Sequence, residues 1–128
     1  MTAPATPPLS PRTILIVEDD DEVLQRFDRA FRAAGWATVD ARNGADAIAL
    51  VKSGLRPTAA LVDIGLPGAS GFDVLRELKT SAPATRALAC SSLEDPILIA
   101  TCRRAGAADF VAKSKGVAEA LRLAEATG

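Results

Sequence analysis

The sequence predicts a doubly wound α/β domain, in which helices cover both faces of a parallel sheet. Short apolar runs of strand length alternate along the chain with amphipathic stretches of helix length, which is the pattern of repeated βα units. The chain has 128 residues, of which 48% are hydrophobic. That length is enough for one domain with a sizeable core and too short for two ordinary domains. We therefore expect a single folded domain.

The strands are predicted from the apolar runs, with ends accurate to a few residues. They are placed at 13–17, 37–41, 58–62, 87–91 and 108–112. Residues 1–12 are rich in proline and small polar residues, a composition that favours extended chain and cannot build a core. We expect 1–12 to be a disordered leader and 13–128 to be the folded domain.

The first two helices are indicated by apolar residues at three- and four-residue steps. The first helix ends at Gly35, and the second begins at about Asn43, a favourable N-cap, and ends at Gly54. The expected inner face of the first helix is Val23, Phe27, Ala30, Phe31 and Ala34, and that of the second is Ala47, Ile48 and Val51.

Three more helices follow the same pattern. The third begins near Gly71, and the fourth begins near Asp95 and Pro96, where proline fits the first helical turn, and ends before Gly106. The last runs from about 115 to 126. The expected buried residues are Val74, Leu75 and Leu78 in the third helix and Val117, Leu121 and Ala124 in the last.

Composition excludes several classes of function. The 15 basic and 16 acidic residues form no basic block, so neither a nucleic-acid nor an anionic-membrane footprint is evident, and proteins are the expected partners. Cys90 and Cys102 have no CxxC spacing and the chain has no histidine, so a zinc site is not expected. The two cysteines are expected to be buried thiols. No apolar stretch reaches membrane-spanning length and the start lacks a signal-peptide pattern, which predicts a cytoplasmic protein.

Charged residues follow three of the predicted strands. Glu18 and Asp19 come after the first strand, Asp63 after the third and Lys113 after the fifth. Because the carboxyl ends of parallel strands meet at one edge of the sheet, these side chains are expected in one pocket, which suits a divalent cation and a phosphoryl group. No glycine-rich phosphate loop follows the first strand, which argues against a nucleotide-binding Rossmann domain.

The pocket suggests a division of roles. Clustered carboxylates are reconciled by a bound cation, and Mg²⁺ prefers oxygen ligands, so Glu18 and Asp19 are predicted ligands. The next three residues, Asp20, Asp21 and Glu22, are interpreted as the acidic start of the first helix. Asp63 is a candidate nucleophile that accepts a phosphoryl group as an acyl phosphate, and Lys113 would neutralise the phosphoryl oxygens.

Four motifs together resemble the receiver domain of bacterial two-component response regulators, over about residues 13 to 126. They are ILIVEDD, DIGLPGASG with its spacing from Asp63 through Pro67 to Gly71, the Ser91-Ser92 pair after the fourth strand, and AGAADFVAK ending in Lys113. The resemblance implies a flavodoxin-like (βα)5 fold with strand order 2-1-3-4-5.

The resemblance also implies site roles. Asp63 looks like the phospho-accepting aspartate, Glu18 and Asp19 like the acidic pair that holds Mg²⁺, the backbone carbonyl of Gly65 like a third protein ligand, and Lys113 like the family's lysine. Ser91 falls where the family has a hydroxyl that turns toward the phosphoryl group, and Phe110 where it has an aromatic switch residue. A strand-end hydroxyl and a core ring are the structural alternatives for these two.

The implied function is phosphorylation-dependent signalling by a stand-alone single-domain response regulator. The expected donor is a sensor histidine kinase or a histidine phosphotransfer protein, and the expected output face comprises the fourth helix, fifth strand and fifth helix. The chain would be a monomer or a phosphorylation-dependent dimer and would not be an enzyme, beyond its own phosphorylation and slow self-dephosphorylation.

The sequence departs from the family at one site residue and leaves alternatives open. Ser114 follows Lys113 where the family usually has a proline joined by a cis bond, so a trans bond is expected, which puts the aim of Lys113 in doubt. The alternatives are a receiver cut from a larger regulator or hybrid kinase, a Mg²⁺-dependent phosphohydrolase, and a receiver-like interaction module that never accepts phosphate. The phosphohydrolase would need a second acid two residues after Asp63, where Gly65 stands.

Overall fold

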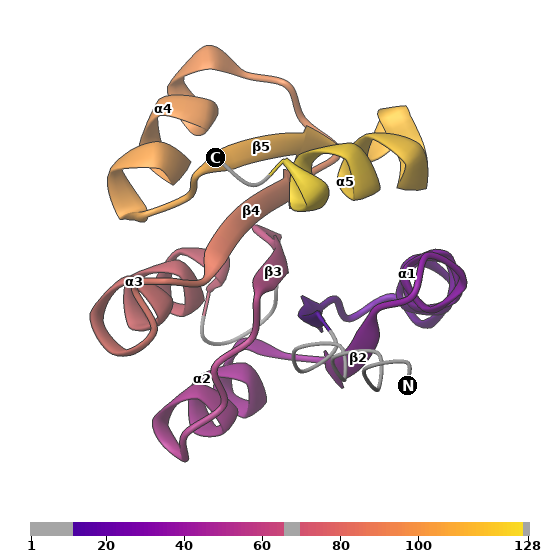
Figure 1. Cartoon of the computed structure of the whole chain (residues 1–128). Coiled ribbons are helices and arrows are strands. Elements are labelled where there is room, and N and C mark those ends of the chain that lie inside the picture. The colour runs from indigo at the N-terminus through magenta and orange to yellow at the C-terminus, as the bar shows by residue number, and fades with distance from the viewer. Residues whose placement is uncertain (1–11, 66–69, 127–128) are drawn as a thin grey trace, which may run out of the picture.

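A computed structural model describes residues 12–65 and 70–126 and shows five strands alternating with five α-helices (Figure 1). The elements are β1 (Thr13–Val17), α1 (Asp21–Ala33), β2 (Ala37–Ala41), α2 (Gly44–Lys52), β3 (Ala59–Asp63), α3 (Gly71–Ser81), β4 (Arg86–Ser91), α4 (Pro96–Ala105), β5 (Asp109–Ala112), a 3₁₀ turn (Lys113–Lys115) and α5 (Gly116–Glu125). The predicted elements are confirmed, with ends shifted by at most two residues. The expected leader lies outside the described residues, apart from Arg12.

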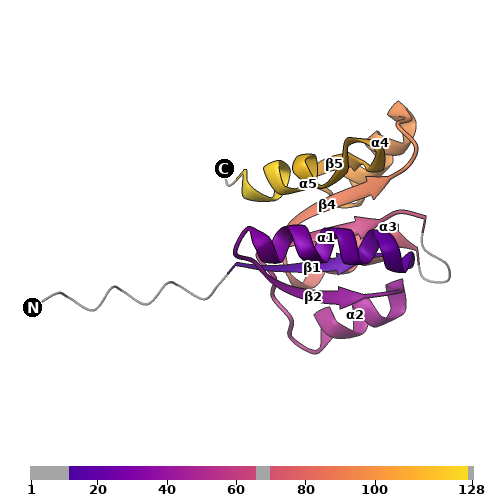
Figure 2. The same cartoon turned by 90° about the vertical axis from the view of Figure 1, so that its right-hand side faces the viewer.

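The strands form one parallel sheet with the order β2-β1-β3-β4-β5, as expected. Because every strand runs the same way, all five carboxyl ends lie along one edge of the sheet, on the right of Figure 2, and the amino ends lie along the other. The register pairs Val17 with Val62 and Asp63 with Cys90, so the ends of β1, β3 and β4 are level with one another. The doubly wound, flavodoxin-like fold is therefore confirmed.

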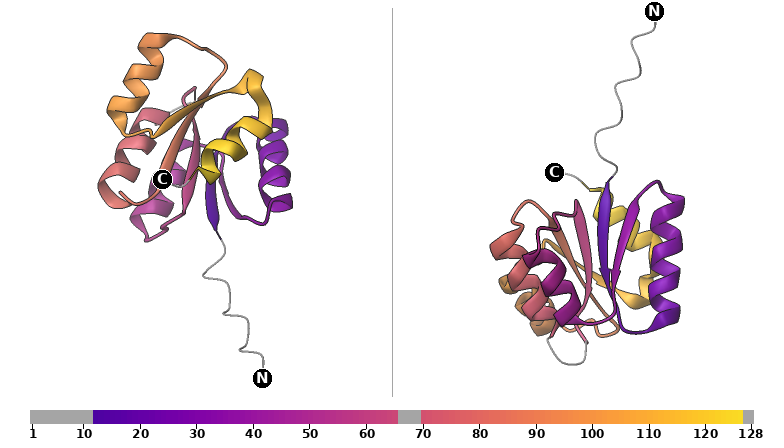
Figure 3. Two further views of the ribbon diagram at one scale, coloured as in Figure 1. Left: turned by 45° about the horizontal axis from the view of Figure 1, so that its top comes forward. Right: turned by 90° about the horizontal axis from the view of Figure 1, so that it is seen from below.

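Helices cover both faces of the sheet, and each face has its own core. One core lies beneath α2, α3 and α4 and the other beneath α1 and α5, and Figure 3 shows the sheet between these two layers. The two cysteines lie in different cores, Cys102 in the first and Cys90 in the second, and both are free and buried, as predicted. None of the helices in the described ranges is long and apolar enough to cross a membrane.

The inner faces of α1 and α5 differ from the prediction by one position. In α1, Leu24 is buried with Phe27 and Phe31, whereas Ala30 is only partly buried. In α5, Ala120 and Leu123 are buried, whereas the expected Val117 and Leu121 are only partly buried. A helix lying flat on a sheet buries a stripe wider than a single i, i+4 row, so the predicted rows define only one side of each contact.

Side-chain caps fix where the helices start. Asp20 caps α1 by accepting from the N–H of Val23, so the predicted helical role of this acidic run is confirmed, and Asn43 caps α2 in the same way. Asp95 accepts from two N–H groups at the start of α4. Ser70 forms a capping box with Asp73 at the start of α3, which holds that helix immediately beside the end of β3.

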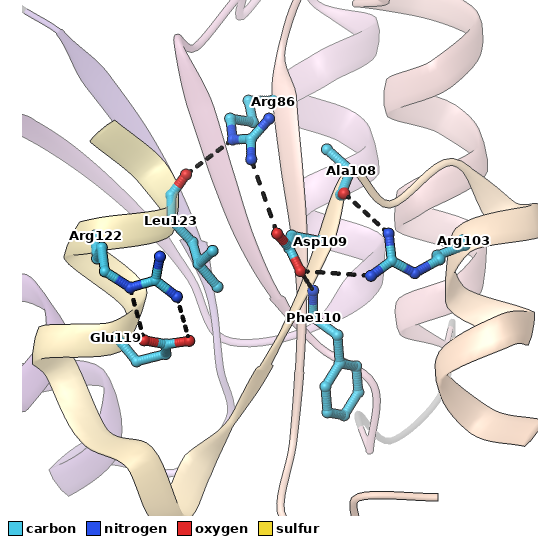
Figure 4. A network of polar contacts seen from close by, with 8 residues as sticks. All are labelled: Arg86, Arg103, Ala108, Asp109, Phe110, Glu119, Arg122 and Leu123. Atoms are coloured by element: carbon cyan, nitrogen blue, oxygen red, sulfur yellow. Dashed lines mark hydrogen bonds and ion pairs between the residues drawn. The ribbon is translucent and has the colours of Figure 1, made fainter. Parts of the chain in front are cut away.

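The amino edge of the sheet carries two polar clusters. In one, Asp109 of β5 pairs with Arg103 of α4 and Arg86 of β4, and Arg86 also donates to the carbonyl oxygen of Leu123 in α5 (Figure 4). These contacts tie α4, β4, β5 and α5 together at the end of the sheet remote from the charged strand ends.

In the other cluster, the guanidinium of Arg12 lies over the ring of Trp36, 4.6 Å from its centroid, and pairs with Glu125 at 3.4 Å. The indole Nε1–H of Trp36 donates to the same carboxylate at 3.3 Å. Arg12 and Glu125 stand near the two ends of the described chain. The two ends are therefore joined at the amino edge of the sheet.

Gly71 is required by a close approach between α3 and the end of β3. A Cβ at this position would lie 2.4 Å from the carbonyl oxygen of Asp63 and 2.8 Å from the Cα of Ile64. Both neighbours are backbone, so they have little freedom to move aside. Gly71 thus lets the first turn of α3 pack directly on the residue that ends β3.

We predict that Gly71→Ala lowers the free energy of unfolding by about 1 to 3 kcal/mol, because the new methyl group overpacks the backbone of Asp63. Alanine normally favours a helix over glycine, so helix propensity alone predicts the opposite sign. Urea denaturation gives the measurement. Gly65→Ala is the control, because its Cβ would make only an ordinary 3.6 Å contact with the Asp63 side chain. A Gly71→Ala chain as stable as wild type would contradict the close-packing explanation.

Candidate functional site

The structure brings the three predicted carboxylates together at the carboxyl edge of the sheet. Glu18 follows β1, Asp63 is the last residue of β3, and the two strands are neighbours. One carboxylate oxygen from each of Glu18, Asp19 and Asp63 lies within 4.8 Å of the others. Glu18 and Asp63 are only 2% and 5% exposed, whereas Asp19 is exposed. The cluster therefore has a buried floor and an open side.

Lys113 joins this cluster from the far edge of the sheet. Its Nζ lies 2.9 Å from Oε1 of Glu18 and 3.2 Å from Oδ2 of Asp63. The lysine follows β5, so its side chain passes over the end of β4 to reach β3 and β1. A single ammonium thus contacts both buried carboxylates.

Backbone N–H groups fix the second oxygen of each buried carboxylate. The N–H of Gly65 donates to Oδ1 of Asp63 at 2.9 Å, and the N–H of Asp20 donates to Oε2 of Glu18 at 3.1 Å. Each carboxylate is therefore held by Lys113 on one oxygen and by the loop that follows its own strand on the other. This leaves little rotational freedom for either side chain.

The electrostatics of the cluster are unbalanced. Burial raises the pKa of Glu18 to about 7, and the negative charge of Asp63 adds to that rise, although the hydrogen bond from Lys113 opposes it. Burial alone would lower the pKa of Lys113, but its contacts with Glu18 and Asp63 raise it above the ordinary value. The lysine therefore keeps its proton, and Glu18 is the group that takes up a further proton as pH falls.

The cluster fits a divalent cation. Three carboxylates against one ammonium leave a net negative charge, and the donors are all oxygens, the type that Mg²⁺ prefers. The exposed position of Asp19 leaves room for water ligands on the open side. Gly65 lies beside Asp63, and its carbonyl stays a predicted ligand. Pro67, part of the sequence motif, is outside the described residues.

The chain forms a 3₁₀ turn after β5, at the place where the family usually has a proline after the lysine. None of the described residues is preceded by a cis peptide bond, so the bond to Ser114 is trans, as predicted. Residues Lys113–Lys115 form the 3₁₀ turn, and Gly116 then takes a φ of 73°, which favours glycine. The doubt about the aim of Lys113 is removed, because its Nζ contacts both acids.

Neither of the two predicted switch residues belongs to the cluster. Ser91 ends β4 and is 8% exposed, and its Oγ accepts a hydrogen bond from the N–H of Leu93 at 3.1 Å. Phe110 is partly buried on β5 and packs against the core beneath α2, α3 and α4. Their proposed movements stay predictions.

Sequence reasoning missed the groups that position the site. The N–H donors of Asp20 and Gly65 are backbone groups and leave no mark on residue type. The packing role of Gly71 was hidden too, because a glycine at a helix start reads equally well as a turn residue. The Ser70 and Asp73 capping box, by contrast, has a sequence signature that could have been recognised.

Comparison with known proteins adds relatives that carry the same domain within longer chains. The chain is 34% identical over 111 residues to a cyclic di-GMP phosphodiesterase of Thermotoga maritima, covering 87% of this chain and 29% of that protein. It is 35% identical over 117 residues to the probable transcriptional regulatory protein TcrX of Mycobacterium tuberculosis, covering 88% and 48%. The chain thus spans less than half the length of these relatives.

A solved structure shows the same fold. A Burkholderia pseudomallei response regulator, determined with a phosphorylated aspartic acid, a calcium ion and citrate, matches with a TM-score of 0.83. It is 21% identical, and the match covers 90% of this chain and 67% of that one. At this identity the likeness concerns the fold.

We predict that the metal-free protein loses stability as pH rises from about 4.5 to 7. The pKa of Glu18 is higher in the folded chain than in the unfolded one, so the folded state binds more protons in this window and is favoured at its acid end. Glu18→Gln should remove this dependence. As pH is raised from 5 to 8, the free energy of unfolding of Glu18→Gln should therefore increase relative to that of wild type by about 1 to 3 kcal/mol. Urea unfolding in EDTA measures both chains, and parallel pH profiles would contradict the assignment.

Most of the chain matches one protein family. The profile of the response regulator receiver domain matches residues 14–124, which include every residue of the carboxylate and lysine cluster. The match covers most of the chain and agrees with the sheet order and with the relatives. The chain therefore belongs to the response regulator receiver domain family.

Proposed function

We propose that this chain is a phosphorylation-dependent switch in which Asp63 accepts a phosphoryl group from a phosphohistidine. The observation that carries the proposal is the position of the Asp63 carboxylate. It is nearly buried at a strand end, contacts Lys113 at 3.2 Å, and lies beside two further carboxylates that suit a divalent cation. Receiver domains in general are signalling switches of two-component systems, which agrees with this assignment.

The chemistry follows from the charge state of the site. An oxygen of the ionised Asp63 attacks phosphorus in line with the leaving imidazole. A P–O bond forms, the P–N bond breaks, and the imidazole nitrogen keeps the electron pair. The nucleophile is already an anion, so no side-chain base is needed. Lys113 is placed to offset negative charge on the transferred group.

Mg²⁺ is the proposed cofactor. Glu18, Asp19, Asp63 and the carbonyl of Gly65 are the residues that would hold it. When bound, the ion supplies positive charge that stabilises the phosphoryl oxygens as negative charge develops. The chain's own contribution is to orient the two buried carboxylates, through Lys113 and the N–H groups of Asp20 and Gly65.

The phosphoryl group adds about −1.5 to −2 charge at the carboxyl edge of the sheet. We propose that Ser91 turns toward it and that Phe110 moves inward. The hydroxyl of Ser91 holds the N–H of Leu93, so its movement would disturb the loop that leads to α4. A population shift on the face formed by α4, β5 and α5 would then change binding to a downstream protein.

The partners and wider setting belong to the same proposal. The donor is a sensor histidine kinase or a histidine phosphotransfer protein, and the protein acts in the cytoplasm. The relatives carry this domain within longer chains, so a stand-alone regulator and a receiver within a larger protein both fit. A phosphohydrolase is less favoured, because Gly65 stands where a second acid would act.

We predict that Asp63→Asn abolishes labelling by acetyl phosphate in the presence of Mg²⁺, because the amide is not a nucleophile for phosphorus at neutral pH. Glu119→Gln is the control. It also removes one negative charge, from a carboxylate on α5 that pairs with Arg122, and should label as wild type. Intact-protein mass spectrometry measures the added phosphoryl group. Equal labelling of wild type and Asp63→Asn would refute Asp63 as the acceptor.

We predict that Lys113→Met lowers the metal-free unfolding free energy at pH 8 by about 2 to 4 kcal/mol, because two buried carboxylates lose their shared counter-charge. The loss should shrink at pH 5, where Glu18 takes up a proton. Lys115→Met, an exposed lysine in the same turn, should change stability by less than about 0.5 kcal/mol. Equal losses at the two pH values would count against the shared-charge explanation.

A further inference from the structure

An exposed apolar groove lies between α3 and α4. We call it the α3–α4 groove, and it is lined by Phe72, Leu93, Asp95, Ile97, Leu98 and Thr101, with a volume of about 350 Å³. Leu93 and Ile97 are 66% and 75% exposed and are the exposed large hydrophobic side chains of the described residues. One exposed leucine needs no explanation, but two that flank one groove form a patch.

The groove differs from the proposed output face. Arg103 lies on α4 and points toward Asp109 of β5 (Figure 4). At 100° per residue, Thr101 lies about 160° and Ile97 about 120° around that helix from Arg103. The α3–α4 groove therefore faces α3 rather than β5 and α5.

The charges along α4 are arranged with opposite signs at the two ends of the groove. Glu94 and Asp95 are exposed in the loop at the start of α4. Ile97, Thr101 and Arg104 follow at steps of four and three residues, so they share one face of the helix. Arg104 donates to the hydroxyl of Thr101 at 3.3 Å, which places its guanidinium at the other end of this face. The face thus reads acidic, apolar and basic in order.

A surface with this order is complementary to itself when reversed. A twofold axis across the middle of α4 would set Ile97 of one copy against Thr101 of the other, and the acidic loop of each copy against Arg104 of the other. We propose that the α3–α4 groove is a homodimer contact, in which α4 helices of two copies pack antiparallel. With two large apolar side chains per copy, the dimer is a weak one.

The contact does not rest on the proposed phosphorylation. Leu93 is linked to Ser91 by a hydrogen bond, so phosphorylation would adjust the dimer, but the apolar and charged groups that form it are exposed without it. The Asp63→Asn chain should therefore dimerise as wild type does when no phosphate donor is present. This separates a failure of the dimer proposal from a failure of the proposed function.

Sedimentation equilibrium over micromolar to millimolar protein tests the contact. Wild type should show a concentration-dependent monomer–dimer equilibrium, and the Leu93→Glu, Ile97→Glu double variant should weaken it at least tenfold. Ala118→Glu is the control, because it adds a glutamate at an exposed position of α5, which covers the opposite face of the sheet from α4, and it should dimerise as wild type does. Circular dichroism melting verifies that the variants are folded.

A charge exchange tests the antiparallel geometry. Glu94→Arg and Arg104→Glu should each weaken the dimer, because like charges would then face one another, and the chain that carries both changes should recover it. Three results would overturn the proposal: wild type monomeric at every concentration, all variants dimerising alike, or Ala118→Glu weakening the dimer as much as the groove variants. A double charge variant that stays as weak as the singles would overturn the antiparallel packing.

Discussion

The structure of the site depends on an excess of negative over positive charge. Two nearly buried carboxylates, Glu18 and Asp63, share the ammonium of Lys113, and Asp19 adds a third negative group at the surface. The parallel sheet makes this arrangement unavoidable, because it sets the ends of β1, β3 and β5 along one edge. A chain that folds in this way carries an unneutralised pocket, and a cation or a proton completes it. The elevated pKa of Glu18 expresses that imbalance within the folded chain.

The surrounding backbone prevents the carboxylates from moving apart to reduce their repulsion. Gly71 allows α3 to press against the end of β3, and the capping box of Ser70 with Asp73 fixes the start of that helix. The N–H groups of Gly65 and Asp20 occupy the remaining carboxylate oxygens. Each of these contacts restrains an acid that would otherwise rotate toward solvent. The pocket therefore stays preorganised despite electrostatic repulsion, a combination that is common at functional sites.

Much of the fold and the membership of the site could be predicted from the sequence, because both follow from local patterns. The apolar runs located the strands, and the charged residue after each run located Glu18, Asp63 and Lys113. What could not be predicted depends on contacts between distant segments. Leu24 was missed because an i, i+4 row marks only part of a buried stripe, and the aim of Lys113 depends on a 3₁₀ turn and the backbone of Gly116. The exposure of Leu93 and Ile97 was hidden as well, since apolar residues near a helix start suggest a core.

The cluster of Arg12, Trp36 and Glu125 has a consequence for how the domain is carried within a longer polypeptide. It fastens the chain's entry into β1 to its exit from α5, at the edge of the sheet opposite the carboxylates (Figure 2). Further chain joined to either end would thus leave the domain at the edge opposite the carboxylates, and the pocket would remain accessible to a donor. The ends of the described chain and the carboxylate pocket are therefore separated by the length of the sheet.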